Sequence, residues 1–301
     1  GGPMPVSIIS SNQESGRLSR SQVNQLIDLD RYPIDQLESD AGRDLIEICH
    51  NNLATQAIAL LPGFIRPSAI SGMAEEAQDL IDQAYRYDQP RVAFYEHPNH
   101  HHRAHDGDDW STLRSKRHPN RYCQILNYQI PNNSNLRAIY LWPKLTEFVR
   151  RVLDVNRLYP SVCPHLALTM KVAFEGDLDG WHYDPNDGVI TLMLQPSESG
   201  GEFEYAPYIR NEQEENYTGV KRLFDSPDTE AQRIKLEAGT FTLFNGRFSM
   251  HRVRPVGSTK QPRIVAIFSY DERPDMVFSQ DYIDMLQSFP QGPPDRNSSI
   301  N

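Results

Sequence analysis

The spacing of apolar residues divides the chain into a helical first part and a strand-rich second part. Over residues 40–61, 68–84 and 135–153, apolar positions recur every three or four residues, which predicts helices that cover a core with one face. Pro62-Gly63 ends the first of these predicted helices. Beyond residue 160, apolar residues alternate with polar ones or form short runs between turn residues, as strands do.

Strands therefore follow helices along the chain, without a repeating strand-helix-strand order. The segments predicted as strands are 123–130, 167–174, 189–194, 202–205, 238–244, 248–253 and 261–268. An acidic insert at 211–238, with a short helix near 217–223, interrupts them, and Asn245-Gly246 predicts a tight turn. This order predicts an α+β protein in which N-terminal helices back an antiparallel sandwich or jelly roll.

The same pattern predicts a single domain over residues 31–287. Its helical part covers about 31–155 and its jelly-roll core about 160–275. Residues 1–30 are rich in Ser, Asn and Gln, and residues 288–301 are rich in Pro, Asn and Ser. Because neither segment has a periodic apolar pattern, we expect a flexible leader and a flexible tail.

Composition narrows the class of protein. The chain is 38% apolar and 23% charged, which is ordinary for a globular protein, and its net charge of −10 argues against nucleic-acid binding. No run approaches the roughly 18 apolar residues of a membrane span, and no secretion signal follows Met4. Cys49, Cys123 and Cys163 are odd in number and widely spaced, so we expect reduced thiols and a cytoplasmic location.

One short motif carries the candidate chemistry. His182 and Asp184 are two residues apart, so on an extended backbone their side chains point to the same face. His251 follows 69 residues later in another predicted strand and is the best candidate for a third ligand. Two imidazoles and one carboxylate leave coordination positions open and suit non-haem Fe(II) better than structural zinc. The alternative for His182 is a hydrogen-bonded, half-buried histidine without a ligand.

A His-rich segment lies between residues 97 and 118. It contains six histidines together with three aspartates, but their spacing matches no structural zinc pattern. We interpret the segment as a solvated loop, with a lid over the active site as the functional alternative. If it is a lid, deletion of residues 99–109 should raise the KM for the substrate.

Several segments of the chain resemble the Fe(II)- and 2-oxoglutarate-dependent oxygenases, and among them the free-amino-acid hydroxylases and halogenases. The segments that carry the resemblance are 29–33, 61–64, 180–184, 200–205 with 209–210, 243–247 and 251–256. Of these, the Gly-Gly-Glu-Phe-Glu-Tyr stretch at 200–205 is the most specific. The resemblance implies a double-stranded β-helix of the cupin type with N-terminal helices packed against it.

The resemblance also implies roles for individual residues. His182, Asp184 and His251 would hold iron, and 2-oxoglutarate would chelate it. Arg263 stands where this superfamily usually places the cation for the distal carboxylate of 2-oxoglutarate, which a planar guanidinium can bind through two hydrogen bonds. Arg252 and Arg254 are the alternatives, and Arg263 could instead be a surface residue at a strand end.

Asp184 bears on the reaction that the resemblance implies. Halogenating members of the group have a small residue in place of this carboxylate, so we expect hydroxylation with O2 as cosubstrate and ascorbate as a supportive reductant in vitro. Desaturation and oxidative cyclisation begin with the same hydrogen abstraction and remain open. The expected substrate is a small molecule, most simply a free amino acid. Its candidate contacts are Glu202, Glu204, Arg210 and Trp181, although the two glutamates could equally face solvent.

Two other classes of protein fit the residues less well. The first is a cupin-like hydrolase or isomerase with Zn2+ or Mn2+, in which Arg263 would have no cosubstrate to bind. The second is a non-catalytic jelly-roll binding module. Succinate release in the presence of Fe(II), ascorbate and 2-oxoglutarate would separate the oxygenase from both.

Overall fold

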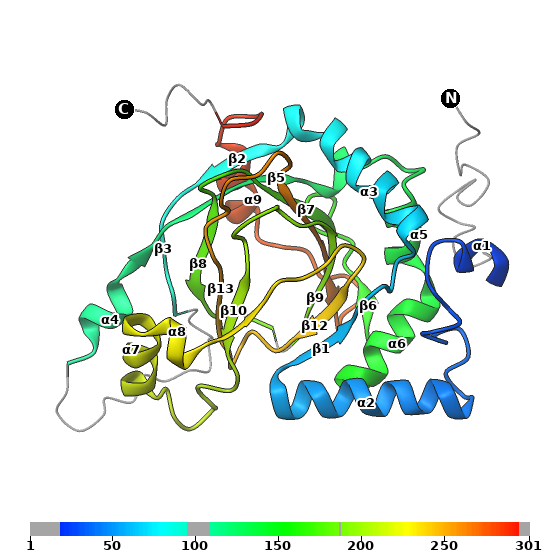
Figure 1. The fold of residues 1–301 in the computed structure, drawn as a ribbon, viewed down its shortest axis with the longest axis horizontal. Coiled ribbons are helices and arrows are strands. Elements are labelled where there is room, and N and C mark those ends of the chain that lie inside the picture. Colours follow the sequence, from blue (N-terminus) through cyan, green and yellow to red (C-terminus); the bar gives the residue numbers. More distant parts are fainter. Residues whose placement is uncertain (1–18, 95–108, 187, 295–301) are drawn as a thin grey trace.

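An 11-stranded antiparallel sheet curls around the centre of the molecule (Figure 1). The computed structural model describes residues 19–94, 109–186 and 188–294. The strands of this sheet are β1 (Ile58–Leu61), β2 (Tyr85–Asp88), β5 (Asn120–Ile125), β7 (Leu168–Ala173), β8 (Leu178–His182), β9 (Val189–Gln195), β10 (Phe203–Ala206), β11 (Gln232–Ile234), β12 (Phe241–Phe244), β13 (Met250–Val253) and β14 (Arg263–Phe268). Their order is β1-β12-β9-β14-β7-β5-β8-β13-β10-β11, with β2 paired to β5. This is the predicted jelly roll.

Two short strand pairs and several helices complete the fold. The pairs are β3 (Arg91–Val92) with β4 (Arg117–His118), and β6 (Tyr159–Pro160) with β15 (Tyr270–Asp271). The helices are α1 (Arg20–Asn24), α2 (Asp40–Gln56), α3 (Pro67–Asp79), α4 (Ser111–Ser115), α5 (Asn135–Leu141), α6 (Pro143–Leu153), α7 (Tyr217–Asp225), α8 (Pro227–Glu230) and α9 (Gln280–Gln287), with 3-10 turns η3 (Ile81–Gln83) and η4 (Asn127–Gln129). Within the described ranges, no helix is long and apolar enough to cross a membrane.

The main core lies between the N-terminal helices and the outer face of the sheet. Successive strand residues point to opposite faces, so alternate residues of β7, including Met170 and Val172, pack against the helices, where Phe148 of α6 is fully buried. Helices α2, α3, α5 and α6 cover this side of the sheet (Figure 1). The residues between them, such as Thr169 and Lys171, face the interior of the curled sheet and line a cavity.

The three predicted helices differ from the observed ones in length or continuity. The helix predicted at 68–84 is α3, which ends at Asp79. Helix α2 stops at Gln56 because Ala57 adopts a left-handed conformation with φ 66°, and the apolar residues after it form β1, which pairs with β12. The predicted helix at 135–153 is two helices, because Pro143 lacks the N–H that a continuous helix needs and begins α6 instead. Helical and strand periods cannot be distinguished over an apolar run as short as β1.

The domain extends beyond both predicted boundaries. Val23 and Ile27 are buried, so the part of the predicted leader after residue 18 belongs to the core, and residues 1–18 lie outside the described chain. In the predicted tail, the Phe289 ring packs 5.1 Å from Tyr87, and the Gly292 N–H donates to the Ala84 carbonyl at 2.8 Å. Residues 295–301 lie outside the described chain. The expected flexible leader and flexible tail are therefore shorter than predicted. A few buried apolar residues are enough to hold an irregular segment against the core.

The Asn245-Gly246 turn does not join a hairpin. It connects β12, which pairs with β1 and β9, to β13, which pairs with β8 and β10. The chain therefore crosses the curled sheet at this turn. The crossing brings the turn against the candidate site.

Candidate metal centre

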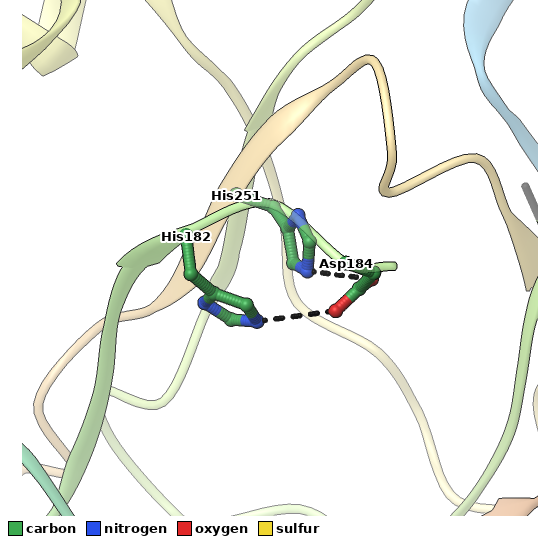
Figure 2. Close-up of side chains that lie close together, drawn as sticks. All are labelled: His182, Asp184 and His251. Carbon is green, nitrogen blue, oxygen red and sulfur yellow. Dashed lines mark ion pairs between the residues drawn. The ribbon is translucent and has the colours of Figure 1, made fainter. Parts of the chain in front are cut away.

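Three side chains that could bind a metal ion converge at one end of β8. His182 is the last residue of β8 and lies opposite His251 of β13 in the antiparallel register, with ring centroids 4.1 Å apart. Asp184 follows two residues after His182. Its Oδ1 lies 3.5 Å from His182 Nε2, and its Oδ2 lies 3.1 Å from His251 Nε2 (Figure 2). The candidate ligand atoms all lie within 4.8 Å of one another.

Both imidazoles are held by backbone carbonyls on the side away from this point. His182 Nδ1 lies 2.7 Å from the Gly180 carbonyl, and His251 Nδ1 lies 2.9 Å from the Ser249 carbonyl. A ring that donates its Nδ1 proton to a carbonyl leaves Nε2 as the lone-pair atom, which is the usual arrangement of a metal-binding histidine. The two Nε2 atoms therefore face Asp184 as candidate ligand atoms.

Asp184 and the two imidazoles interact strongly with one another. Burial opposes charge on Asp184, but His251 and His182 outweigh it and hold the pKa of the carboxyl well below its usual range. Burial likewise disfavours a charged His251, yet Asp184 raises the pKa of the imidazole above its usual value. Asp184 Oδ2 is buried and receives no well-aligned hydrogen bond from the described residues. A metal ion would satisfy this oxygen and both ring nitrogens at once.

Gly246 leaves the space that Asp184 occupies. The Asp184 N–H donates to the Gly246 carbonyl at 3.0 Å. A Cβ at residue 246 would lie 1.9 Å from Asp184 Oδ2 and 2.8 Å from His251 Cε1, distances that no side chain can adopt. The sequence indicated only a turn at Asn245-Gly246, because the approach to Asp184 depends on two segments that are distant in the chain.

A cavity of about 630 Å³ inside the curled sheet contains this centre. Arg263 of β14 lines the same cavity opposite Ala173 of β7 and is only 7% exposed. Its side chain forms no hydrogen bond or ion pair with the residues that the structure describes. Burial lowers the pKa of Arg263 to about 10, so the guanidinium is still charged at neutral pH. The Asp179 carboxylate attracts Arg263 but does not outweigh its burial and forms no ion pair with it. A buried cation without a direct ion-pair partner fits a site for an anionic ligand.

The alternative arginines point away from the cavity. Arg252 pairs with Glu204 at 2.7 Å and stacks on Trp181 with its guanidinium 4.5 Å from the ring centroid. Arg254 lies 3.9 Å from a carboxylate oxygen of Glu202. Alternation along β13 explains the difference, because His251 and Val253 face the cavity and their neighbours face the other side.

None of the four residues suggested as substrate contacts is among those that line the cavity. Phe203 faces the cavity, so alternation turns Glu202 and Glu204 to the opposite face. The alternative of a solvent-facing Glu204 is wrong, because this residue is fully buried between Arg233 and Arg252.

Arg210 and Trp181 pack beside the candidate metal centre, outside the cavity lining. The Arg210 guanidinium lies 3.5 Å from the ring centroid of Tyr183, next to Asp184, and donates from Nε to the Arg247 carbonyl. Trp181 is buried in a cluster that the acidic insert covers with α7. The predicted short helix of that insert is confirmed as α7.

Four charged residues in the cavity were missed by sequence reasoning. They are Arg91 of β3, Arg121 of β5, Lys171 of β7 and Asp179 of β8. Lys171 had a detectable signal, because it interrupts the apolar run of β7 at a position whose neighbours two residues away, Thr169 and Ala173, also face inward. Of the predicted His-rich loop at 97–118, residues 97–108 lie outside the described chain. His118 is described and is buried in β4, away from the cavity lining.

Comparison with known proteins defines the class of the chain. The model of the halogenase D family matches residues 102–285, which is more than half of the chain. The fold is similar to the alpha-ketoglutarate-dependent epimerase SnoN from nogalamycin biosynthesis, at 14% identity and TM-score 0.50, covering 84% of this chain and 92% of that chain. AviO1 from Streptomyces viridochromogenes Tue57 is also 14% identical at TM-score 0.50, covering 76% and 95%. No curated protein matches the chain.

These findings identify an oxidoreductase with the jelly-roll fold of the 2-oxoglutarate- and Fe(II)-dependent dioxygenases. The chain belongs to the halogenase D family. The predicted enzyme class and fold are thereby confirmed, and an oxidoreductase is favoured over a hydrolase or a binding module. The cytoplasmic location stays a prediction.

Proposed function

We propose that the protein is a non-haem dioxygenase that hydroxylates an unactivated C–H bond of a small substrate, most simply a free amino acid or a close derivative. His182, Asp184 and His251 would hold Fe(II), and Arg263 would bind the distal carboxylate of 2-oxoglutarate. The observation that carries the proposal is the position of Arg263, a buried cation without a partner among the described residues, in the same cavity as three convergent ligands.

The residues present suit this cofactor and cosubstrate. Two neutral imidazoles and one carboxylate form the facial set typical of non-haem Fe(II), with open positions for 2-oxoglutarate and O2. When bound, this pair supplies the oxidation: O2 and 2-oxoglutarate are consumed, succinate and CO2 are released, and one oxygen atom is transferred to the substrate. The protein positions the reacting groups, neutralises the cosubstrate carboxylate with Arg263, and shields the site from bulk water inside the sheet.

Asp184 favours hydroxylation, although the family to which the chain belongs is named for halogenation. A chloride ion on iron would need the coordination position that the Asp184 carboxylate would take. Gly246 reinforces this assignment, because its missing side chain leaves room for the carboxylate beside His251. Desaturation and oxidative cyclisation would use the same residues and are distinguished by the mass of the product.

Anaerobic titration tests the assignment of Arg263. The protein with Fe(II) and 2-oxoglutarate should develop the visible charge-transfer band of the ternary complex, and turnover with ascorbate should release succinate. In the R263L variant we expect the 2-oxoglutarate affinity to fall by about 10-fold or more, as for loss of a charge-assisted hydrogen bond. The affinity for Fe(II) should change little.

The R254L variant is the matched control, since it removes an arginine from the other face of the sheet. It should leave both affinities unchanged. If R263L keeps the wild-type affinity for 2-oxoglutarate, a cation other than Arg263 binds the distal carboxylate. If the wild-type protein shows no charge-transfer band, the dioxygenase proposal itself is contradicted.

A mass screen tests the substrate class. The loaded enzyme is incubated with pooled free amino acids, and the products are searched for the gain of one oxygen atom or the loss of two hydrogen atoms. Gain of oxygen supports hydroxylation, loss of hydrogen supports desaturation or cyclisation, and gain of chlorine in the presence of chloride contradicts the role given to Asp184.

A further inference from the structure

The cavity around the metal centre carries an excess of positive charge. The described side chains that line it include four cations and two carboxylates, namely Arg91, Arg121, Lys171, Arg263, Asp179 and Asp184. In the proposed function Asp184 binds the metal and Arg263 binds 2-oxoglutarate. Asp179 then remains as the single carboxylate facing three cations.

Asp179 is shared between two of these cations. Lys171 Nζ lies 3.2 Å from Asp179 Oδ2, and Arg91 Nη2 lies 3.7 Å from Asp179 Oδ1. The Lys171 ammonium also lies 4.3 Å from the ring centroid of Tyr122, which lines the same cavity. One carboxylate thus neutralises half of the charge of the Arg91-Lys171 pair.

Donor groups of this pair remain available. An ammonium group carries three N–H donors, and Asp179 is the single acceptor that Lys171 has among the described residues. Arg91 Nε is buried and has no hydrogen-bond partner among them. The side chains of Arg91 and Lys171 are 34% and 22% exposed, so both can reach a ligand in the cavity.

The pair also lies close to the metal centre. Asp179 Oδ1 is 3.9 Å from Nδ1 of His182, on the side of the ring away from Nε2. A cavity of about 630 Å³ is within the range that holds drug-sized ligands, so it has room for a primary substrate beside 2-oxoglutarate. An anion bound between Arg91 and Lys171 would leave the rest of its molecule near the open metal positions.

We propose that Arg91 and Lys171 form an anion subsite that binds a carboxylate group of the primary substrate. The inference rests on the proposed function and specifies its substrate class. A free amino acid would place its α-carboxylate in this subsite. A basic side chain would find no unpaired carboxylate in the described lining, so lysine-like and arginine-like substrates are disfavoured, whereas neutral and acidic ones fit.

Three probes of equal length and different charge test the subsite. Hexanoate, hexan-1-ol and hexylammonium are titrated by calorimetry into the anaerobic protein loaded with Fe(II) and 2-oxoglutarate, so that Arg263 is already occupied. We expect hexanoate to bind about tenfold more tightly than the other two, because it gains charge-assisted hydrogen bonds. Equal or tighter binding of hexylammonium or hexan-1-ol, or no measurable preference for hexanoate, would overturn the proposal.

Variants assign the effect to the pair. K171M and R91M should each remove most of the preference for hexanoate while the affinity for 2-oxoglutarate stays at the wild-type value, and K171R should restore the preference. K221M is the matched control, because it removes an exposed lysine that pairs with Asp225 on α7. If K171M weakens 2-oxoglutarate and leaves hexanoate unchanged, Lys171 serves the cosubstrate and the inference fails.

The two proposals fail in different ways. If Fe(II) and 2-oxoglutarate produce no charge-transfer band, the proposed function is wrong. Hexanoate can then be titrated into the ligand-free wild-type, R263L and K171M proteins. Comparison of the three affinities still decides whether the Arg91-Lys171 pair binds anions. Should K171M not fold, R91M and K171R carry the comparison.

Discussion

Two single residues determine the space around Asp184 and the positive charge of the cavity. Gly246 touches the two ligands that come from different segments, and Arg263 carries an unpaired charge in the cavity. Neither feature benefits the stability of the protein. Strained or uncompensated positions of this kind are typical of functional sites, where binding of a ligand supplies the missing partner.

We expect the G246A variant to bind metal poorly. The added Cβ would lie 1.9 Å from Asp184 Oδ2, so the carboxylate must move away from the two imidazoles. Loss of one well-placed ligand should weaken the affinity for Fe(II) or Mn(II) by about 10-fold or more in an anaerobic titration, as for disturbed ligand support.

The control for this variant is G72A. Gly72 lies in α3, and nothing stands within 4 Å of a Cβ added there. Alanine in a helix is about 0.5–1 kcal/mol better than glycine, so G72A should be slightly more stable and should bind metal normally. Normal metal binding by G246A would show that the turn can move aside.

R263L should stabilise the protein in the absence of ligands. Burial lowers the pKa of Arg263 to about 10, below its usual value of 12.5, so the folded state holds the proton less well than the unfolded state. The charged side chain therefore costs stability below about pH 10. We expect a Tm increase of about 2–4 °C in thermal unfolding, which corresponds to about 1 kcal/mol for a chain of this size.

The increase should be the same from pH 6 to pH 9, because both pKa values lie above that window. Addition of 2-oxoglutarate and Mn(II) should raise the Tm of the wild type more than that of R263L. A ligand-free R263L protein that is less stable than the wild type would mean that Arg263 has a structural role.

At the scale of elements, β8 carries His182, the first candidate ligand, and must be held in register. The turn before it is fixed by Asp177, which is 2% exposed and receives two hydrogen bonds of 2.6 Å from Arg86 of β2. Asp177 also accepts from the Phe174 N–H at the end of β7. One carboxylate thus ties β2, β7 and the start of β8 together.

D177N should destabilise the fold strongly. It leaves the half-buried Arg86 without its counter-ion, and loss of one partner of a buried pair typically costs about 3–5 kcal/mol. Chemical denaturation measures this loss. The control D225N breaks an exposed pair with Lys221 on α7 and should cost less than about 0.5 kcal/mol. Similar values for the two variants would show that the Arg86 pair contributes little.

At the scale of the whole molecule, the curled sheet separates a dry outer face from a polar interior. Cys49, Cys123 and Cys163 all belong to the dry regions and are free and buried. Burial raises the pKa of the Cys49 and Cys123 thiols to about 11. None of the three lines the cavity.

Thiol labelling measures the integrity of this packing. At pH 8 the native protein should react slowly with iodoacetamide at all three buried cysteines, because access requires opening of the core. At Cys49 and Cys123 the raised pKa also makes the reactive thiolate scarce. Denaturant should expose all three. Rapid labelling of the native protein at Cys49 or Cys123 would contradict the described core.

The sequence by itself determined the class of fold and the three candidate ligands. The order of helices and strands follows from local periodicity, and the spacing of His182 and Asp184 places both on one face. The role of Arg263 was expected from the family resemblance and stays a prediction. The periodicity and the His182-Asp184 spacing could be interpreted from the sequence because they depend only on residues that are close together in the chain.

Only the tertiary structure decided which charges share the cavity. Glu204 and Lys171 are both charged residues in apolar strands, yet one is turned outward to Arg252 and the other inward to Asp179. The direction depends on the register and curl of the whole sheet, since a shift of one residue would exchange the two faces. For the same reason the close approach of Gly246 to Asp184 could not be predicted, because it joins segments that only the closed sheet brings together.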